Sequence, residues 1–237
     1  MFNKGKPQSR SLATRAAIFQ TALSLFRRDG PDAATMRDIA REANIALGAA
    51  YYYFSSKEAI LQAYYDQVQE LHHACVREAL AQPGLTFAER LKAVFHSKLD
   101  LLRDDHRILG ALFRYAGEPG HPLAAFGPAT RKHRERAIAT FALALQDEKL
   151  PDEIRAILPT LLWSAHMGVL LYFIYDESPE HARTRKLVDG AISLFTSLLS
   201  LVSLPLIKPF RGRLANLLRE AGFVPPPHSG SLPGGLR

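Results

Sequence analysis

The chain has 237 residues, of which 47% are hydrophobic and 22% are charged. This composition excludes a short peptide and a disordered chain, and it is typical of a soluble globular protein with a sizeable core. The sequence holds no run near the roughly 18 uninterrupted apolar residues of a membrane-spanning helix, so we expect no membrane partner. Its single cysteine, Cys75, cannot form an intrachain disulfide, which favours a reducing, cytoplasmic location.

The excess positive charge lies at the two ends of the sequence. Lys and Arg number 30 against 23 Asp and Glu, which gives a net charge of +7. Residues 1–28 carry six basic and no acidic side chains, and residues 208–237 carry five basic and one acidic. This distribution predicts a small polyanion-binding region joined to a larger, nearly neutral body. The alternative is that the basic termini only aid solubility.

Apolar residues recur with the 3.6-residue period of amphipathic helices along almost the whole chain, which predicts an all-α fold. Residues 1–9 are expected to form a flexible basic arm. A first helix is then expected over residues 10–29, because Gly30 and Pro31 form a stop signal.

Two short helices separated by a tight turn are expected next. Thr35 followed by Asp38 resembles a capping box and predicts the start of the first of them. Asn44 tolerates a left-handed backbone and marks the turn, after which residues 47–54 form the second. The three helices together make a small domain over residues 10–56.

A larger helical body is expected over residues 57–207. Its expected helices cover residues 55–81, 86–103, 106–115, 129–146, 161–175 and 179–202. Pro159 predicts either a break or a kink just before residue 161. Residues 208–237 are expected to hold a short basic helix and a disordered tail rich in Pro and Gly.

The last two helices of the body are unusually apolar. The helix over residues 161–175 is apolar on nearly all sides, and the helix over residues 179–202 has an apolar second half. A helix that is apolar on all sides must be covered on all sides. We therefore expect the pair to pack against its copies in a second subunit, as a four-helix interface across a two-fold axis. Burial within one subunit is the alternative.

The small domain has the geometry that places a helix in the DNA major groove, with two short helices joined by a tight turn and braced by a preceding helix. The residues that carry this pattern are Ile18, Ala22, Phe26, Gly30, Thr35, Ile39, Ala40, Ala43, Asn44, Ile45, Gly48, Ala49, Ala50, Tyr51, Tyr52, Tyr53, Phe54, Lys57 and Glu58. In this order and spacing they closely resemble the N-terminal DNA-binding domain of the TetR/AcrR family of bacterial transcription regulators.

The resemblance implies how the whole protein works. It implies a homodimer that binds a near-palindromic operator in double-stranded DNA and acts as a repressor. The C-terminal domain of such a protein dimerises and encloses a pocket, and a small-molecule inducer in that pocket shifts the spacing of the two DNA-binding heads. We expect this inducer to be largely apolar.

Nine residues are expected to contact DNA: Thr35, Arg37, Leu47, Gly48, Ala49, Tyr51, Tyr52, Tyr53 and Lys57. A helix N-terminus, tyrosine hydroxyls and a lysine suit backbone phosphates, which assigns Thr35, Tyr51, Tyr53 and Lys57 to the phosphates. One of the three tyrosines is expected to point inward. Ile39, Ile45 and Phe54 are expected to build the small core.

Base reading falls to the remaining residues. Gly48 permits close approach, Ala49 can touch a thymine methyl, Tyr52 can reach a base edge, and Arg37 can bind a guanine through two hydrogen bonds. Few hydrogen-bonding side chains face the groove, and Ala46 offers no helix cap. We therefore expect specificity to depend on Arg37, on the basic arm in a minor groove and on DNA shape.

Six residues are candidates for lining the inducer pocket: Phe95, Leu99, Phe113, Trp163, His166 and Met167. They combine apolar bulk with one titratable group, as small-molecule sites usually do. The alternative is that they are ordinary core residues.

No catalytic, metal or cofactor site is expected. His72 and His73 are adjacent and point in different directions on a helix, and the sequence has neither a phosphate-binding glycine loop nor a nucleophile elbow. Two other interpretations stay open. The body could bind a protein partner instead of a metabolite, or the chain could be a helical enzyme or lipid-binding protein with a basic surface.

Overall fold

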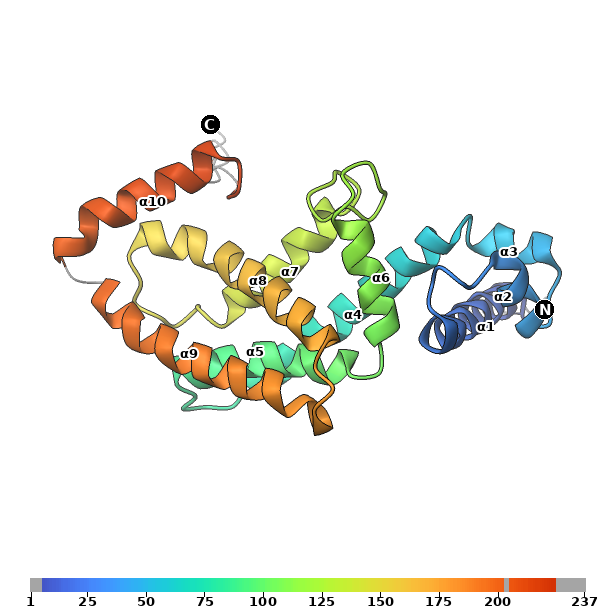
Figure 1. Ribbon diagram of the computed structural model, residues 1–237, viewed down its shortest axis with the longest axis horizontal. Helices are drawn as coiled ribbons and strands as arrows, with labels where there is room; N and C mark the ends of the chain where they lie inside the picture. The colour runs from blue at the N-terminus through green and yellow to red at the C-terminus, as the bar shows by residue number, and fades with distance from the viewer. Residues whose placement is uncertain (1–5, 203–204, 225–237) are drawn as a thin grey trace, which may run out of the picture.

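The computed structural model describes residues 6–202 and 205–224, and within these ranges the chain forms helices and no strand (Figure 1). This confirms the predicted all-α fold. The α-helices are α1 (Lys6–Asp29), α2 (Met36–Glu42), α3 (Leu47–Tyr53), α4 (Lys57–Leu80), α5 (Phe87–Leu102), α6 (His106–Ala116), α7 (Arg131–Leu143), α8 (Asp152–Ile174), α9 (Ala182–Val202) and α10 (Lys208–Glu220). Two 3₁₀ turns, Pro179–His181 and Pro205–Ile207, precede α9 and α10.

Helices α1, α2 and α3 form a small domain at one end of the molecule, far from α9 and α10 (Figure 1). Its core contains Ile18, Phe26, Ile39 and Phe54, each at most 3% exposed. Burial of such side chains is worth about 1.5–3 kcal/mol each, so the core dominates the stability of this domain.

The predicted basic arm is in part wrong, because α1 begins at Lys6 rather than at residue 10. Pro7 lies in the first turn of the helix, where its missing N–H and fixed φ are tolerated. The rest of the arm, residues 1–5, lies outside the described residues, as does the tail predicted over residues 225–237.

Helix α4 runs from the small domain into the body (Figure 1). Ser56 caps its N-terminus by accepting a hydrogen bond from the backbone N–H of Ala59 at 3.3 Å. Its first turns bury Ile60 and Leu61, and its later turns bury Val68 and Val76. A change in the position of α4 within the body therefore moves the small domain.

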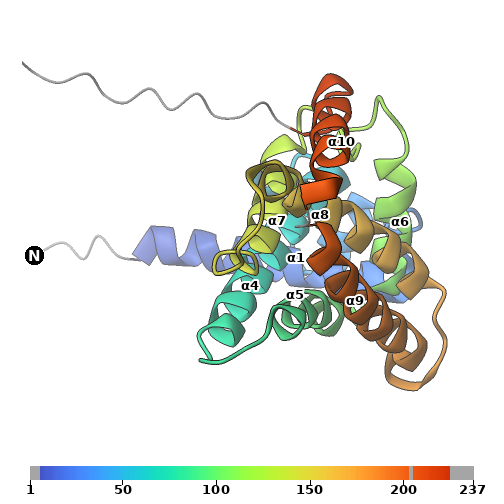
Figure 2. The same ribbon diagram turned by 90° about the vertical axis from the view of Figure 1, so that its left-hand side faces the viewer.

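Five helices close a ring in the body, seen roughly end-on in Figure 2. Helix α4 contacts α5, α5 contacts α9, α9 contacts α8, α8 contacts α7, and α7 returns to α4. Helix α6 lies against both α1 and α8, and α10 packs on α8. Helix α5 also contacts α7 and α8, so the body is a helical bundle, and both α4 and α6 join it to the small domain.

Helix α8 continues through Pro159 as one helix, which excludes the break, one of the two alternatives expected at this position. Proline removes one backbone hydrogen bond. The helix is held together by packing, since Ile157 and Leu158 before the proline and Leu162 and Trp163 after it are all buried. Helix α8 is also long and apolar enough to cross a membrane by length and composition alone, but the same test is passed by the core helix of a soluble protein.

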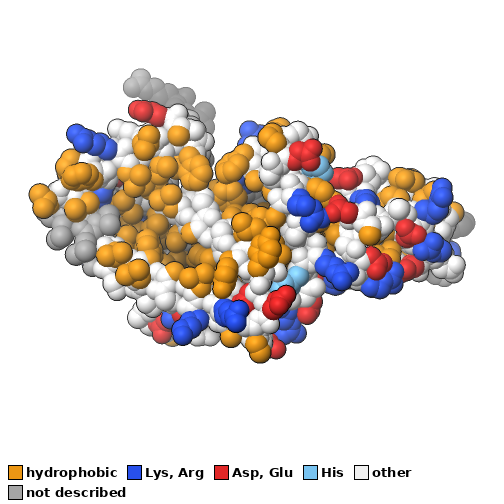
Figure 3. Space-filling model, in the orientation of Figure 1, with side chains coloured by type: hydrophobic (Ala, Val, Ile, Leu, Met, Phe, Trp, Pro, Cys, Tyr) orange, Lys and Arg blue, Asp and Glu red, His pale blue; other side chains and the backbone are white. Residues whose placement is uncertain are grey.

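The outer faces of α8, α9 and α10 are apolar and exposed (Figure 3). In α9, Val188 and Ile192 face inward, whereas Leu187, Leu194 and Leu198 are between 47% and 63% exposed. The other large apolar side chains exposed on these helices are Leu171, Tyr172, Phe210, Leu214 and Leu217. Burial within one subunit therefore leaves part of the apolar surface of these helices uncovered.

Candidate DNA-binding and ligand sites

The helix-turn-helix is built as the sequence predicts. Thr35 forms a capping box at the start of α2: its Oγ1 accepts from the backbone N–H of Asp38 at 3.1 Å, and its own N–H donates to Asp38 Oδ2 at 3.1 Å. Asn44 has a φ of 53°, the left-handed conformation expected at the turn. Ala46 precedes α3 without any side-chain cap. These local features fix the angle between α2 and α3.

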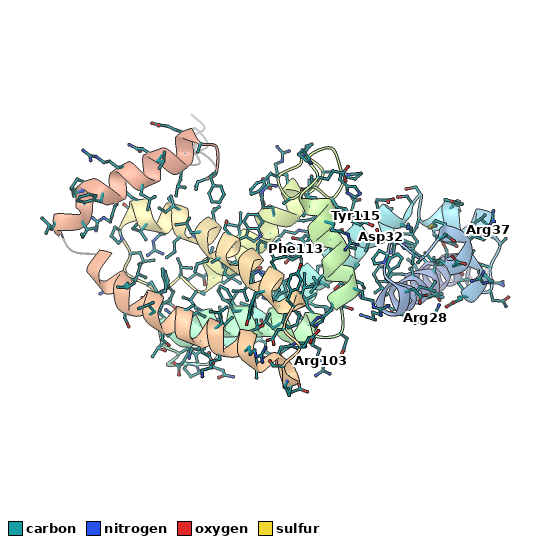
Figure 4. All side chains as sticks on the ribbon, viewed as in Figure 1. Arg28, Asp32, Arg37, Arg103, Phe113 and Tyr115 are labelled. Carbon is teal, nitrogen blue, oxygen red and sulfur yellow. The ribbon has the colours of Figure 1, made fainter. Side chains whose placement is uncertain are left out.

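Five of the nine residues predicted to contact DNA are exposed: Thr35, Arg37, Gly48, Tyr51 and Tyr52. Tyr52 is 82% exposed and Tyr51 is 49% exposed, which is unusual for tyrosine in the absence of a partner. Arg37 projects from α2 at the tip of the small domain (Figure 4). Leu47 and Ala49 are half-buried, and the neighbouring Ala50 is fully buried and anchors α3.

Tyr53 and Lys57 are engaged with the small domain itself. Tyr53 is half-buried, and its hydroxyl donates to Ser11 Oγ of α1 at 3.3 Å, so it is the tyrosine that points inward. The Lys57 ammonium donates to the carbonyl of Pro31 at 2.6 Å and lies 3.4 Å from the carbonyl of Asp32. Both side chains therefore brace the domain, whatever they contribute to phosphate binding.

The basic residues of α1 serve more than one purpose. Arg15 stacks its guanidinium 4.6 Å from the centre of the Phe54 ring. Arg28 forms ion pairs with Asp29 at 2.8 Å and with Glu42 of α2 at 2.9 Å. The positive end of the sequence is therefore not a uniform surface for DNA, because part of its charge is used inside the domain.

One ion pair joins the small domain to the body. Arg27 of α1 donates from Nε to Asp105 Oδ1 at 2.6 Å, and Tyr64 of α4 donates its hydroxyl to Asp105 Oδ2 at 2.6 Å. Asp105 lies just before α6 and is 2% exposed. Hydrogen bonding to Asp105 raises the pKa of Arg27, and burial together with the Asp105 charge raises the pKa of Tyr64.

A second set of contacts joins α6 to the small domain. Arg114 and Tyr115 both bind the carboxylate of Asp32, in the segment between α1 and α2 (Figure 4). The hydrogen bond from Tyr115, followed by that from Arg114, lowers the pKa of Asp32. Arg107, at the start of α6, donates to the carbonyl of Arg28. Sequence reasoning missed these contacts, because the paired residues are about 80 positions apart.

The body contains a cavity of about 100 Å³, where one water molecule needs roughly 10–15 Å³. It is lined by α4, α5, α6, α7, α8 and the loop before α7. Four of the six predicted pocket residues line it: Phe113, Trp163, His166 and Met167. The other two, Phe95 and Leu99, are buried core residues and are not part of the lining. Helix α5 contributes two other residues to the lining, Lys98 and Leu102.

Of the two α5 residues in the lining, Lys98 is the charged one, and sequence reasoning missed it. Its side chain is 4% exposed and donates to Gln69 Oε1 of α4 at 3.2 Å. His72 and His166, 1% and 3% exposed, also line the cavity, with ring centres 6.4 Å apart. The signal was present in the sequence, because Lys98 falls on the apolar face of α5, three and four residues after Phe95 and Val94.

Comparisons with known proteins agree with this architecture. The family described as "Bacterial regulatory proteins, tetR family" matches residues 18–64, and the family described as "Tetracyclin repressor-like, C-terminal domain" matches residues 90–211. The A-factor receptor protein of Streptomyces griseus is 40% identical over 89 residues, which are 36% of this chain and 32% of that protein. The HTH-type transcriptional regulator UidR of Escherichia coli K12 is 36% identical over 82 residues, 35% of this chain and 41% of that protein.

The similarity to these curated relatives thus spans only about a third of their length. A solved structure shows the fold over nearly the whole chain. The TetR-family regulator from Pectobacterium atrosepticum matches with a TM-score of 0.62 and 17% identity, over 82% of this chain and 97% of that one. With both domains matched in order, the chain belongs to the TetR family of DNA-binding transcription regulators.

Proposed function

We propose that the protein is a homodimeric repressor that binds a near-palindromic operator and is released from it by a small ligand. The observation that carries this proposal is the position of α6. One face of α6 lines the cavity through Leu109, Leu112 and Phe113. Its other face binds the small domain through Arg107, Arg114 and Tyr115.

The exposed apolar faces of α8, α9 and α10 support dimerisation. Leu187, Leu194 and Leu198 recur at helical spacing on the outside of α9. On α8 the outward positions include Ala165 and Gly168, whose small side chains allow a second helix to approach closely. A two-fold interface uses the same patch on both subunits, so it would bury the exposed apolar residues of both helices.

The DNA interface in this proposal uses the exposed side chains of α2 and α3. Tyr51, Tyr52 and Arg37 are free to reach the groove and the adjoining phosphates. Thr35 at the N-terminus of α2 and Lys57 at the start of α4 flank them on the phosphate side. A bacterial regulator that binds chromosomal DNA works in the cytoplasm, so we expect the protein there.

Ligand release follows from the two faces of α6. A molecule that fills the cavity pushes against Phe113 and Leu109, and α6 can respond only by shifting against α1 and the segment that holds Asp32. Helix α4 also lines the cavity, through Tyr64 and Gln69. A bound ligand would therefore contact both α4 and α6, the two helices that join the body to the small domain. The spacing of the two heads in a dimer would then no longer match the operator.

The test of this proposal is selection of binding sites from a random duplex library with the full-length protein, followed by footprinting. We expect inverted half-sites whose centres lie about one helical turn, or a multiple of it, apart. Binding should weaken linearly in log affinity against log salt. Selection of single, unpaired half-sites by a monomer in solution would contradict the proposal.

A further inference from the structure

The cavity contains a buried cation that has no acidic partner. Lys98 is almost fully buried, its ammonium binds the neutral side chain of Gln69, and it pairs with no carboxylate anywhere in the described chain. A buried charge is normally paired, because burial removes the stabilising effect of water. Burial accordingly lowers the pKa of Lys98 to about 7.

Among the residues that the structure describes, no Asp or Glu lines the cavity, whereas two cationic side chains, Lys98 and Arg134, do. Two acidic residues that lie beside lining residues, Asp105 and Asp66, have partners of their own. Asp105 accepts hydrogen bonds from Tyr64 and Arg27, and Asp66 Oδ1 lies 2.9 Å from His133 Nδ1 and 3.6 Å from Arg136. Arg134 is held by the carbonyl of Ala125 at 2.7 Å. The uncompensated charge within the lining is therefore that of Lys98.

Two buried histidines add polar atoms without partners. His72 uses Nε2 to donate to the carbonyl of Val94 at 2.9 Å, which leaves its Nδ1 atom buried and unpaired within residues 6–202 and 205–224. His166 has a buried, unpaired Nε2 atom in the same part of the structure. Burial lowers the pKa of both rings, with a smaller contribution from the Lys98 charge. Both are therefore neutral at pH 7, and His166 can donate a hydrogen bond from Nε2.

We propose that the cavity binds a small amphipathic carboxylate, whose anionic end pairs with Lys98 and accepts a hydrogen bond from His166. Its apolar part lies against apolar side chains that also line the cavity, among them Leu109, Leu112, Phe113, Trp163 and Met167. This inference rests on the proposed ligand-responsive function and narrows the ligand from a largely apolar molecule to one with an acid group. A charge-assisted hydrogen bond in a dry site supplies the pairing that the protein leaves unmade.

The experiment uses three matched probes of the same chain length: octanoate, 1-octanol and octylamine. Binding to the full-length protein is measured by calorimetry and by thermal shift, and the acid series is extended from butanoate to dodecanoate and to 3-phenylpropionate. The variant is Lys98→Met, which keeps an unbranched side chain one atom shorter and removes the charge. The control is Lys92→Met on the same helix, because Lys92 lies at the surface beside Asp189.

We expect at least one acid of the series to bind and to lose tenfold or more of its affinity in Lys98→Met, with no change in Lys92→Met. The matched alcohol should bind more weakly to the wild type and equally to both proteins, and the amine should not bind. Equal binding of acid and alcohol, or no Lys98-dependent binding across the whole acid series, would overturn the inference.

DNA release is measured separately on a selected operator fragment with the same probes. An acid that binds through Lys98 without releasing the DNA leaves the anion site intact and contradicts the inducer role. Release by a neutral probe alone supports the proposed function and contradicts the acid ligand. The two proposals therefore fail in different ways.

Discussion

Arg27 and Asp105 lie 78 positions apart in the sequence, yet their side chains meet at 2.6 Å across the boundary between the small domain and the body. Asp105 is the shared acceptor of Arg27 and of the cavity residue Tyr64. The position of α1 is therefore set by a carboxylate that a cavity residue also binds, which makes this pair the most direct physical link between the two candidate sites.

Replacing Asp105 with Asn should destabilise the protein and weaken this link. The amide keeps the size of the carboxylate but loses the charge that both donors bind, at a cost of about 1.5–3 kcal/mol in the free energy of unfolding. Urea denaturation of the full-length protein measures the loss. The matched control is Asp104→Asn, since Asp104 is exposed and lies 3.6 Å from Arg103; it should change stability by less than about 0.5 kcal/mol. An equal loss in the free energy of unfolding for the two variants would show that the ion pair between Arg27 and Asp105 contributes no more stability than the exposed pair.

Lys98 should make stability depend on pH. Its pKa is lowered from 10.5 in the unfolded chain to about 7 in the folded protein, so between these values the unfolded state binds more protons. Stability from this group therefore rises as pH rises from 7 toward 10.5, by at most about 1.4 kcal/mol per pH unit. Lys98→Met should remove this slope and add roughly 1–3 kcal/mol at pH 7. The check is the difference between wild type and variant in urea unfolding at pH 6, 7, 8 and 9, and a constant difference would refute the assignment.

Arg37 and Lys57 should differ in what they contribute to DNA binding. Arg37→Ala should cost about 1–3 kcal/mol at one base position and relax the preference there. Lys57→Ala should weaken binding to all sequences alike and reduce the salt slope by about one. Mobility shifts with a set of single-base operator variants measure both, with Lys132→Ala on α7 as a control for lost surface charge. The reverse assignment would be shown by a sequence-dependent effect at Lys57.

The apolar stripe of α9 should hold the dimer together. Leu194→Lys places a charge at the centre of the proposed interface, where burying it without a partner is costly. We expect the variant to run as a single chain in size-exclusion chromatography with light scattering, and to bind a full operator much more weakly. Leu12→Lys on α1 is the matched control, because Leu12 is 65% exposed on the small domain. A wild-type protein that is itself monomeric would contradict the proposal directly.

The sequence was enough to predict the elements whose signals are local. The capping box at Thr35, the left-handed turn at Asn44 and the short helices around it follow from residues close together in the chain, and the structure agrees with them. The uncapped start of α3 at Ala46 was equally readable. Such features depend on neighbouring backbone groups, so they need no knowledge of the tertiary fold.

Long-range features were not predictable in the same way. The sequence left a break and a kink open at Pro159, and the helix continues there because packing on both sides outweighs one lost hydrogen bond. Apolar bulk with one titratable group predicted four of the lining residues, but a lysine on the apolar face of a helix does not by itself indicate a cavity, so Lys98 was missed. The role of Asp105 could not be predicted at all, since its two partners come from α1 and α4.

Different side chains of α6 contact the cavity and the small domain, which affects how the ligand specificity of such a regulator can change. The side chains that contact the small domain are those of Asp105, Arg107, Arg114 and Tyr115. The side chains of α6 that line the cavity are different ones, namely Leu109, Leu112 and Phe113. Substitutions at the cavity-lining residues of α6 can therefore change which ligand binds without removing the contacts between α6 and the small domain. An engineer seeking a biosensor for a new compound has separate parts to work on.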